Sequence, residues 1–487
     1  MLSLLMACTS TVRIVPRDAA TGDPPEARTY EVDVIEPGRI SRGPTPVDSR
    51  AFQRSLRQLA RGMRTEGSPQ EAARELLRAG LEMEGEWVAE ASRGQVFSLF
   101  PADDKGLLTP LEAEALKRDY VAWCSGQGGG DCLGLFEDGP FLRTDDRRTL
   151  ALALAFGSVW DEAREALRRE VLNPQMVLAT VVWTVGMYLA LWLVPEPITK
   201  AVAAALTVVL VGWLGAGTLL GLMDGWALMA HRAHEARTFA ELRDAGAQFA
   251  KVLGTDATRT FVMAVAALTG RTLGEISAHM RSLPGYGVAL VQAEAQGLRL
   301  SVALESVESV AVSSEGAFAV VVLSHHSAVS AGGAPGRPTA TTVIRHRGGN
   351  QQVVLSNGQR WHLPRGKSLQ DIPLEDPLGD ELQAAANKLA KEWGPSKLST
   401  AERKAITDAL EEGKGFQAAR LEGQARGRWV ESQLQRLFKH LKWNSQGVDV
   451  TGPAGQAYHY EVLAGSENNF GLHGRRMFNV FFRMIHF

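Results

Sequence analysis

Two long stretches without a charged residue constrain the fold of this chain more than any other feature. Residues 176–194 form a run of 19 uncharged residues, and residues 201–223 form a second run of 23. As helices they would be roughly 28 and 34 Å long, close to the thickness of about 30 Å of a bilayer's hydrocarbon core. The short segment PEPITK separates the two runs. We therefore predict an apolar helical hairpin over residues 174–232.

This hairpin is compatible with two environments. Gly217 and Gly221 have the spacing at which small residues let helices pack closely. In the first run, Gly186, Thr180 and Thr184 make membrane insertion only marginally favourable. We predict that the hairpin packs against neighbouring amphipathic helices and enters a bilayer during delivery. A permanently buried hairpin is the alternative.

Length and charge exclude several classes of protein. At roughly 150 residues per domain, 487 residues correspond to about three domains. With 45% hydrophobic and 22% charged residues, the chain is too apolar for a disordered protein. Lys and Arg number 52 against 54 Asp and Glu, a net charge of -2, which excludes a globally basic nucleic-acid binder. Any nucleic-acid contact must therefore be local.

Two of the three cysteines bracket a glycine-rich loop. Cys124 and Cys132 flank the sequence CSGQGGGDC, which is flexible enough to bring two sulfurs together. This arrangement suggests a local disulfide, and the spacing fits two free thiols as well.

The third cysteine follows a short apolar start. The residues Leu5-Met6-Ala7-Cys8 resemble a bacterial lipobox, which predicts a lipoprotein signal at 1–7, lipidation of Cys8 and a tether over 8–48. A secreted location also favours the disulfide between Cys124 and Cys132. Thr9 after the cysteine is typical of sorting to the outer membrane.

Helical periodicity dominates the first half of the chain. Apolar residues three and four apart predict a helical domain at 49–173 and a helical region at 233–285. Two segments, Ser68-Pro69-Gln70-Glu71 and Thr109-Pro110-Leu111-Glu112, have the pattern of a capped helix start.

The pattern changes near residue 286, where short β-branched segments begin. Four segments predict strands: 287–292, 298–304, 307–314 and 317–324. A Gly- and Pro-rich linker follows, and Asn357-Gly358 then indicates a β-hairpin. We therefore predict a β-rich region with a linker over 286–365.

The carboxyl-terminal part, 366–487, combines helices with strands, in the order helix, helix, strands, helix from residue 396. Its core, 420–487, contains nine Lys and Arg residues against five acids, although the whole chain is slightly negative. This excess of positive charge indicates a polyanionic partner at this end.

Three acids in this core have the placement of metal ligands. Asp449 and Glu461 lie twelve residues apart on two predicted strands joined by a turn, and Glu431 lies on the preceding helix. Hard oxygen ligands that leave positions for water and phosphate suit Mg²⁺ or another divalent cation. We predict that all three acids are metal ligands and catalytic residues. The remaining predicted residues are His473 and Arg475 as catalytic, and Arg475, Arg476 and Arg483 as substrate-binding.

This pattern resembles the restriction-endonuclease-like nuclease fold, whose motif is an Asp followed by Glu-x-Lys. The chain departs from the motif at Leu463, where the fold has lysine. Arg475, His473 or His459 are the candidates to replace that cation. A structural alternative treats Asp449 as a turn cap and Glu461 as an ion-pair partner.

Over nearly its full length the chain resembles the swarming-inhibition lipoprotein toxins of myxobacteria. The resemblance rests on the lipobox, LWLVPEPITKAVAAALTVVLVGWLG, RWHLPRGKSLQDIPLEDPLGDELQ, and the ending with GVDV, YEVLAGSENN, HGRRM and FFRMIHF. It implies a polymorphic toxin that kin cells pass on by outer-membrane exchange, with a cognate immunity protein in the producer. It also implies that the last hundred residues or so carry the toxicity.

The expected protein is therefore multidomain: mainly α in its amino-terminal and central regions, with the apolar hairpin, a small β region and a carboxyl-terminal α+β restriction-endonuclease-like domain. We expect it to be lipid-anchored in the outer membrane. Its last domain would hydrolyse DNA or RNA in the recipient cytoplasm. The alternatives are a pore-forming toxin that acts through residues 176–223 and a non-enzymatic envelope lipoprotein.

Overall fold

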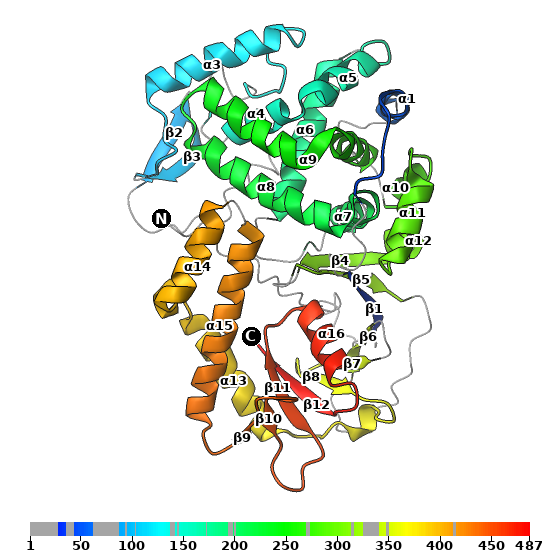
Figure 1. The fold of residues 1–487 in the computed structure, drawn as a ribbon, viewed down its shortest axis with the longest axis vertical. Coiled ribbons are helices and arrows are strands. Elements are labelled where there is room, and N and C mark those ends of the chain that lie inside the picture. Colours follow the sequence, from blue (N-terminus) through cyan, green and yellow to red (C-terminus); the bar gives the residue numbers. More distant parts are fainter. Residues whose placement is uncertain are drawn as a thin grey trace. The chain divides into compact units, whose positions relative to one another are not determined.

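The chain folds into helices and one large mixed sheet, which belong to two compact units (Figure 1). The computed structural model describes residues 28–35, 43–61, 87–92, 95–102, 104–136, 142–143, 146–171, 173–192, 198, 201–268, 273–312, 316–324, 340–346, 350–412 and 415–487. The first unit contains the described residues of 43–192 and 209–293. The second contains those of 28–35, 198–208 and 294–487. The lipobox with Cys8 and the predicted helix cap at Ser68 lie outside the described residues.

The first unit is mainly helical, as its periodicity predicted. Thr109 and Glu112 form the expected capping box at the start of α3. The described helices of this unit are α1 (Ser49–Ala60), α3 (Pro110–Ser125), α4 (Asp146–Ala155), α5 (Gly157–Leu167), α6 (Pro174–Leu191), α8 (Ala216–Glu235), α9 (Phe239–Leu268), α10 (Leu273–Met280) and α11 (Tyr286–Ala295).

One part of the predicted helical domain is a β-hairpin instead. Strand β2 (Trp87–Ser92) pairs antiparallel with β3 (Gln95–Pro101). The helical interpretation of residues 87–91 was wrong because the next segment, QVFSLFP, is rich in aromatic and β-branched residues and offers a partner strand.

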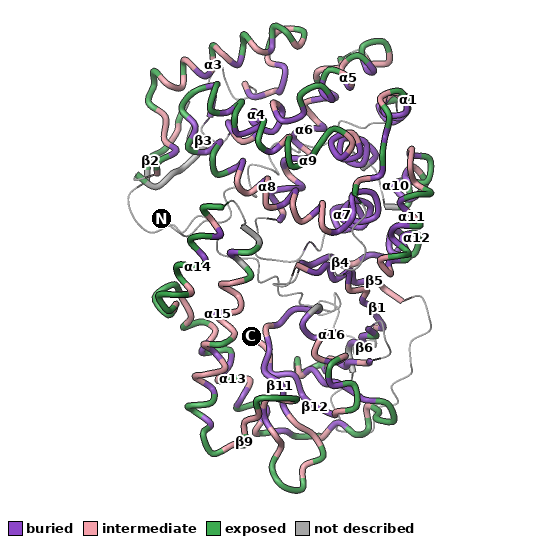
Figure 2. The backbone as a smooth tube through the Cα atoms, viewed as in Figure 1, coloured by how far each residue is buried: buried purple, intermediate pink, exposed green. Residues whose placement is uncertain are grey.

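The apolar hairpin differs from the prediction in its second half. The first run forms α6, but the second breaks at Gly215 into α7 (Ala201–Leu214) and α8, which meet at a bend of 116°. Gly215 has a φ of 80°, in the left-handed region that glycine adopts readily. By length and composition, α6 qualifies as a membrane span, and the bent pair would count as a second if it acted as one span. Figure 2 shows α7 almost wholly buried.

A disulfide joins Cys124 at the end of α3 to Cys132. The loop between them contacts the following helices. Gln175 of α6 donates to the carbonyl oxygens of Gln127 (3.1 Å) and Gly129 (3.2 Å) in this loop. Just after the loop, the carbonyl oxygen of Leu133 accepts a hydrogen bond from the indole N–H of Trp183, also on α6 (2.9 Å). The cross-link thus fixes a loop that packs against the apolar helix α6.

The second unit is built on a ten-stranded mixed sheet in the order β4-β5-β1-β6-β7-β8-β12-β11-β10-β9. Its strands are β1 (Arg28–Ile35), β4 (Val307–Val312), β5 (Phe318–Leu323), β6 (Ala340–His346), β7 (Gln351–Leu355), β8 (Arg360–Leu363), β9 (Lys442–Trp443), β10 (Val450–Thr451), β11 (His459–Leu463) and β12 (Phe482–His486). The predicted tether thus contributes a strand, β1, to the middle of this sheet. The hairpin at Asn357-Gly358 is confirmed, because β7 and β8 pair antiparallel on either side of it.

Three other predicted elements have the wrong type. Residues 287–292 and 298–304 lie mainly in helices, α11 and α12 (Leu300–Ser306). In α11 the buried residues Ala289, Gln292 and Ala293 have the three- and four-residue spacing of a helix, which the short segment hides. The predicted last helix ends early: α16 (Glu467–Arg476) is followed by strand β12, which is buried between β8 and β11.

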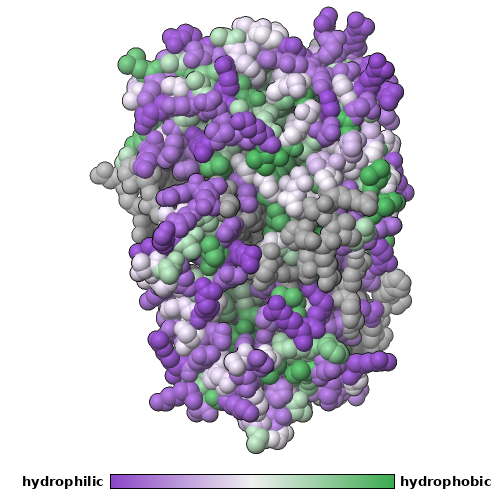
Figure 3. Space-filling view, viewed as in Figure 1, coloured by the Kyte–Doolittle hydropathy of each residue, from purple (hydrophilic) through white to green (hydrophobic). Residues whose placement is uncertain are grey.

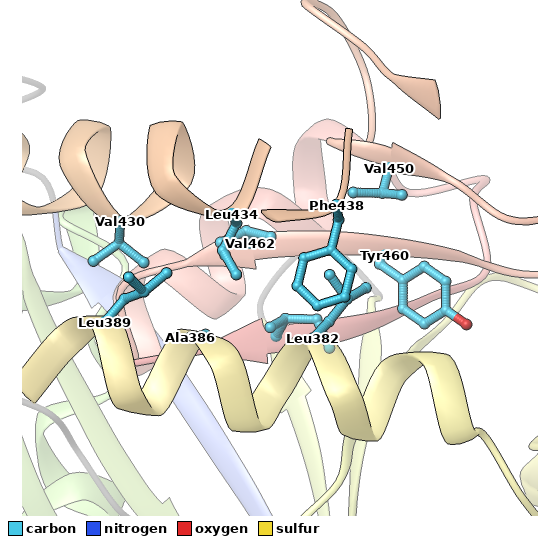
Figure 4. Packing of buried hydrophobic residues seen from close by; sticks show 10 residues of the cluster. Leu382, Ala386, Leu389, Val430, Leu434, Phe438, Val450, Tyr460 and Val462 are labelled. Atoms are coloured by element: carbon cyan, nitrogen blue, oxygen red, sulfur yellow. The ribbon is translucent and has the colours of Figure 1, made fainter. Parts of the chain in front are cut away.

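Helices cover both faces of the carboxyl-terminal strands. On one face, α13 (Pro377–Glu392) and α15 (Gly415–Leu437) pack against Val450, Tyr460, Val462 and Ile485 in the core cluster of Figure 4. On the other, α16 packs through Phe470 against a second cluster that includes Leu463, Phe482 and Met484. A further helix, α14 (Thr400–Glu411), contacts α15. Because β8 pairs with β12, residues 366–487 share one sheet with the preceding β-rich region.

The surface has the usual mixture of a folded protein. Among the coloured residues of the face in Figure 3, hydrophobic side chains lie in small groups between hydrophilic ones.

Candidate functional site

The candidate site lies where strands β10 and β11 diverge. Val450 pairs with Tyr460, and beyond this pair two carboxylates replace the backbone ladder. The Asp449 N–H donates to Oε2 of Glu461 at 3.0 Å, and the Val462 N–H donates to Oδ2 of Asp449 at 2.8 Å. The reciprocal bonds bring the two predicted ligands together at the end of the strand pair.

Strand alternation decides which face these carboxylates occupy. Because Val450, Tyr460 and Val462 point into the core with α13 and α15, Asp449 and Glu461 lie on the opposite face, which α16 covers. From α16, His473 reaches Glu461, with 2.5 Å between Nδ1 and Oε1. Glu461 is 3% exposed and His473 is 24% exposed, so the histidine lies between the buried acid and solvent.

Proximity of like charges and burial perturb the acids. Burial, followed by the charge of Glu461 and then that of Glu431, raises the pKa of Asp449 to about 8, although the Val462 N–H acts in the opposite direction. Burial and the charge of Glu461 also raise the pKa of Glu431, against a hydrogen bond from Gln435. Burial and the neighbouring carboxylates therefore favour the protonated forms of Asp449 and Glu431.

The third predicted ligand, Glu431, lies on a helix of the other layer. Glu431 lies on α15, next to Val430, which belongs to the core cluster. Its charge contributes to the raised pKa of Asp449, and the charge of Glu461 contributes to the raised pKa of Glu431. Within the described ranges, however, no three or more His, Cys, Asp and Glu side chains are arranged to hold a metal ion. The fold thus pairs Asp449 with Glu461 and keeps Glu431 within electrostatic range.

The predicted arginines have different surroundings. Arg476 is exposed at the end of α16, and Arg475 beside it is half-buried. Arg483 is 2% exposed and forms ion pairs with Asp376 (2.9 Å) and Asp380 (2.6 Å).

The placement of Arg483 contradicts its predicted role in substrate binding. Strand β12 puts it in register with Tyr460, so it points to the α13 side, away from the face of Glu461. The sequence pattern predicted Arg483 on a helix, so the alternation of side chains along strand β12 was not taken into account.

Three side chains were candidates for the missing lysine. The position itself, Leu463, packs in the hydrophobic cluster under α16. His459 accepts a hydrogen bond at Nδ1 from the Gly452 N–H (3.1 Å), and burial lowers its pKa. Of the three candidates, His473 has a hydrogen bond to Glu461.

Sequence reasoning missed a residue beside the acids. Asn444 donates its backbone N–H to the Asp449 carbonyl oxygen (2.9 Å), and its side chain donates to the Val448 carbonyl oxygen and to Oγ1 of Thr451, each at 2.9 Å. It closes the loop that precedes β10. The Asn-Ser-Gln-Gly turn at 444–447 is the signal that would have indicated it.

Sequence reasoning also missed a buried polar layer beneath α16. Arg360 of β8 donates to both carboxylate oxygens of Glu467, at 2.6 Å each, and to Gln352. Gln352 and Asn350 then donate to the carbonyl oxygens of Phe470 and Gly471. These bonds fix α16 on the sheet and thereby orient His473. Polar residues within the otherwise apolar strand RWHL were the available signal.

No protein-family model, no curated protein and no solved structure matches this chain.

Proposed function

We propose that the carboxyl-terminal part of this chain is a metal-dependent nuclease that hydrolyses phosphodiester bonds of DNA or RNA. The observation that carries the proposal is the Asp449–Glu461 pair. Two carboxylates held side by side at diverging strands, with the pKa of Asp449 raised to about 8, form a site that a divalent cation would neutralise.

The donor set fits Mg²⁺. Asp449 and Glu461 would supply hard oxygen ligands, Glu431 would act through its charge or through a water, and the other positions would remain for water and phosphate. When bound, such a cation supplies Lewis-acid activation of water and charge neutralisation at the phosphate. His473 would hold Glu461 in orientation and accept or release a proton at Nε2, on the side away from the acid.

The order of elements supports a restriction-endonuclease-like domain. Helix α15 carries Glu431, strands β9 and β10 form an antiparallel pair with Asp449 just before β10, and Glu461 lies on β11. Helix α16 and the parallel neighbour strand β12 follow. An Asp and a Glu on adjacent strands agree with the first two acidic positions of that motif.

We further propose that the chain is a lipid-anchored outer-membrane toxin, with an immunity protein and the exchange machinery as partners. This part rests on the resemblance of the sequence to the swarming-inhibition toxins and on Cys8. The apolar helix α6 supports a membrane step during delivery. It equally favours a second candidate function, in which α6 to α8 permeabilise the recipient membrane.

The nuclease proposal is tested with the purified full chain, plasmid DNA and total RNA, in Mg²⁺ and in chelator. We expect Mg²⁺-dependent cleavage of at least one substrate and a loss of at least about 100-fold in Asp449→Asn, which removes a charge at the reacting centre. The matched control is Asp408→Asn, at an exposed carboxylate paired with Lys404 on α14. Cleavage that survives chelator, or that Asp449→Asn retains, would contradict the proposal.

A cellular experiment separates the two candidates. The Cys8→Ser chain is expressed in a bacterial cytosol, and nucleic-acid integrity and membrane potential are followed together. Growth arrest with degraded nucleic acid supports the nuclease, whereas depolarisation that persists in Asp449→Asn supports the pore.

A further inference from the structure

We propose that Arg436, Lys439 and Lys442 form a basic edge that binds the phosphodiester backbone of the nucleic acid beside the Asp449–Glu461 pair. This inference rests on the proposed function and adds to it the surface that receives the substrate.

The basic edge belongs to a segment that begins and ends at the site. Residues 432–448 contain no Asp or Glu, and the flanking acids are Glu431 and Asp449. Within this segment the chain carries three permanent cations and His440. The chain between Glu431 and Asp449 therefore carries only positive charge, and it leads from helix α15 through β9 to the start of β10.

Packing turns the helical part of the basic edge outward. Near the end of α15, Leu434 and the following Phe438 are buried in the core cluster. Arg436 and Lys439, three residues apart, are exposed. Arg436 is in the last turn of α15 and Lys439 is in the turn that follows the helix, so the two exposed cations lie close together along the chain at the surface.

Strand register places Lys442 next to Asp449. Lys442 pairs with Thr451 and Trp443 pairs with Val450. Because Val450 is in the core and Trp443 packs against it, Lys442 lies on the opposite face, with Asp449. Lys442 and Asp449 are then diagonal neighbours, for which Cβ separations of about 7–8 Å are typical. At this separation from Asp449, the side chain of Lys442 is placed to contact a phosphate next to the scissile one.

Among the described residues, none of the three cations forms an ion pair, and the sheet ends at β9, so no described strand covers the outer side of Lys442. By contrast, Arg428 on the same helix pairs with Glu402 (2.8 Å), and the buried Arg483 pairs with two aspartates. The basic edge therefore replaces Arg483 as the source of phosphate contacts.

Salt dependence measures this contact directly. Each neutralised phosphate contributes about 0.7–0.9 to the slope of log affinity against log salt concentration. We therefore expect Arg436→Gln/Lys439→Gln/Lys442→Gln to lower the slope by about 2 and to weaken binding at least about 10-fold at low salt.

The experiment uses the full chain in chelator, which prevents cleavage, and fluorescence anisotropy with labelled single-stranded DNA, duplex DNA and RNA. The matched control is Arg365→Gln/Lys388→Gln/Lys391→Gln, which removes three exposed cations from the same unit without an ion pair in the described structure. Binding that the edge variant loses and the control retains supports the proposal for whichever nucleic acid shows it.

Three results would overturn the proposal: equal loss in both triple variants, no loss in the edge variant, or no binding of any of the oligonucleotides by the wild-type chain. Vesicles with anionic lipid form a separate arm. If the edge variant loses vesicle binding but keeps nucleic-acid binding, the surface contacts lipid and the proposal fails. Wild-type binding without cleavage after Mg²⁺ is added would sink the proposed function while the basic edge stands.

Discussion

At the scale of residues, the proposed chemistry depends on two carboxylates, Asp449 and Glu461, that each accept a backbone hydrogen bond at the other's strand. The bonds from the Asp449 and Val462 N–H groups fix the acids in place. The same bonds keep like charges together in a half-buried position, which raises the pKa of Asp449 to about 8. The ionised pair is therefore unfavourable in this position, and protonation of Asp449 relieves the repulsion.

This pKa makes stability depend on pH in a defined direction. The pKa of an Asp in the unfolded chain is 3.8, so folded Asp449 holds its proton more tightly, and the stability that this group contributes is fully present below about pH 4. That contribution is lost as pH rises toward 8. We expect the melting temperature of the second unit to fall across this window in chelator, and the fall to be smaller in Asp449→Asn.

The effect of a divalent cation on the melting temperature tests the same carboxylate pair. At pH 8, Mg²⁺ or Ca²⁺ should raise the melting temperature of the wild-type chain, because binding to the folded state stabilises it. It should leave Asp449→Asn nearly unchanged, while Asp408→Asn behaves like wild type. Thermal melts at pH 5 and pH 8 with and without cation provide the measurement, and a pH-independent wild type would contradict the assignment.

At the scale of elements, α16 decides where His473 lies. The helix approaches the sheet through two glycines. A Cβ at Gly471 would meet the ring of His346 at 2.6 Å, and a Cβ at Gly474 would meet Asn350 Nδ2 at 2.8 Å. The polar layer of Arg360 and Glu467 fixes the start of this helix. The site therefore requires glycine where a side chain would push the helix away.

Substitution of Gly474 tests this packing. Gly474→Ala should destabilise the chain by about 1–3 kcal/mol, as overpacking does, and should reduce nuclease activity because His473 moves with the helix. The control is Gly427→Ala on α15, where a Cβ meets nothing within 4 Å, and this change should stabilise the helix by about 0.5–1 kcal/mol. Chemical denaturation measures both; equal stability of the two variants would refute the close approach.

Elements with strong local signals were predicted well. Thr109 and Glu112 start α3, and Asn357-Gly358 joins β7 to β8, because capping and tight turns are decided by a few adjacent residues. Short apolar segments were predicted less well. Residues 287–292 were predicted as a strand and the chain from 482 as a helix, because a buried, mostly apolar segment of five or six residues is too short to distinguish the two periods.

At the scale of the whole molecule, the sheet joins segments that the sequence separates widely. Strand β1, from the predicted tether, lies between β5 and β6, and β8 pairs with β12, the neighbour of the site strand β11. Helix α13 contributes Leu382, Ala386 and Leu389 to the core beneath β10 and β11. We therefore expect that a fragment without α13 and β8 does not fold on its own.

A truncation tests this dependence. The fragment 396–487 lacks α13 and β8, so Arg483 would lose Asp376 and Asp380 and the core would lose one of its two helices. We expect it to show no cooperative melt by circular dichroism and rapid proteolysis, whereas 350–487 should be more protected. Cooperative unfolding of 396–487 alone would contradict this expectation.

The sequence by itself determined the apolar helices, the caps, the turn at Asn357-Gly358 and the proximity of Asp449 to Glu461, because each follows from residues close along the chain. Tertiary structure alone decided that Gly215 breaks the second apolar run, that Arg483 points away from the site, and that His473 contacts Glu461. The physical reason is that strand alternation, helix packing and ion pairing between distant segments select which face a side chain occupies, and composition and spacing along the chain carry no record of that choice.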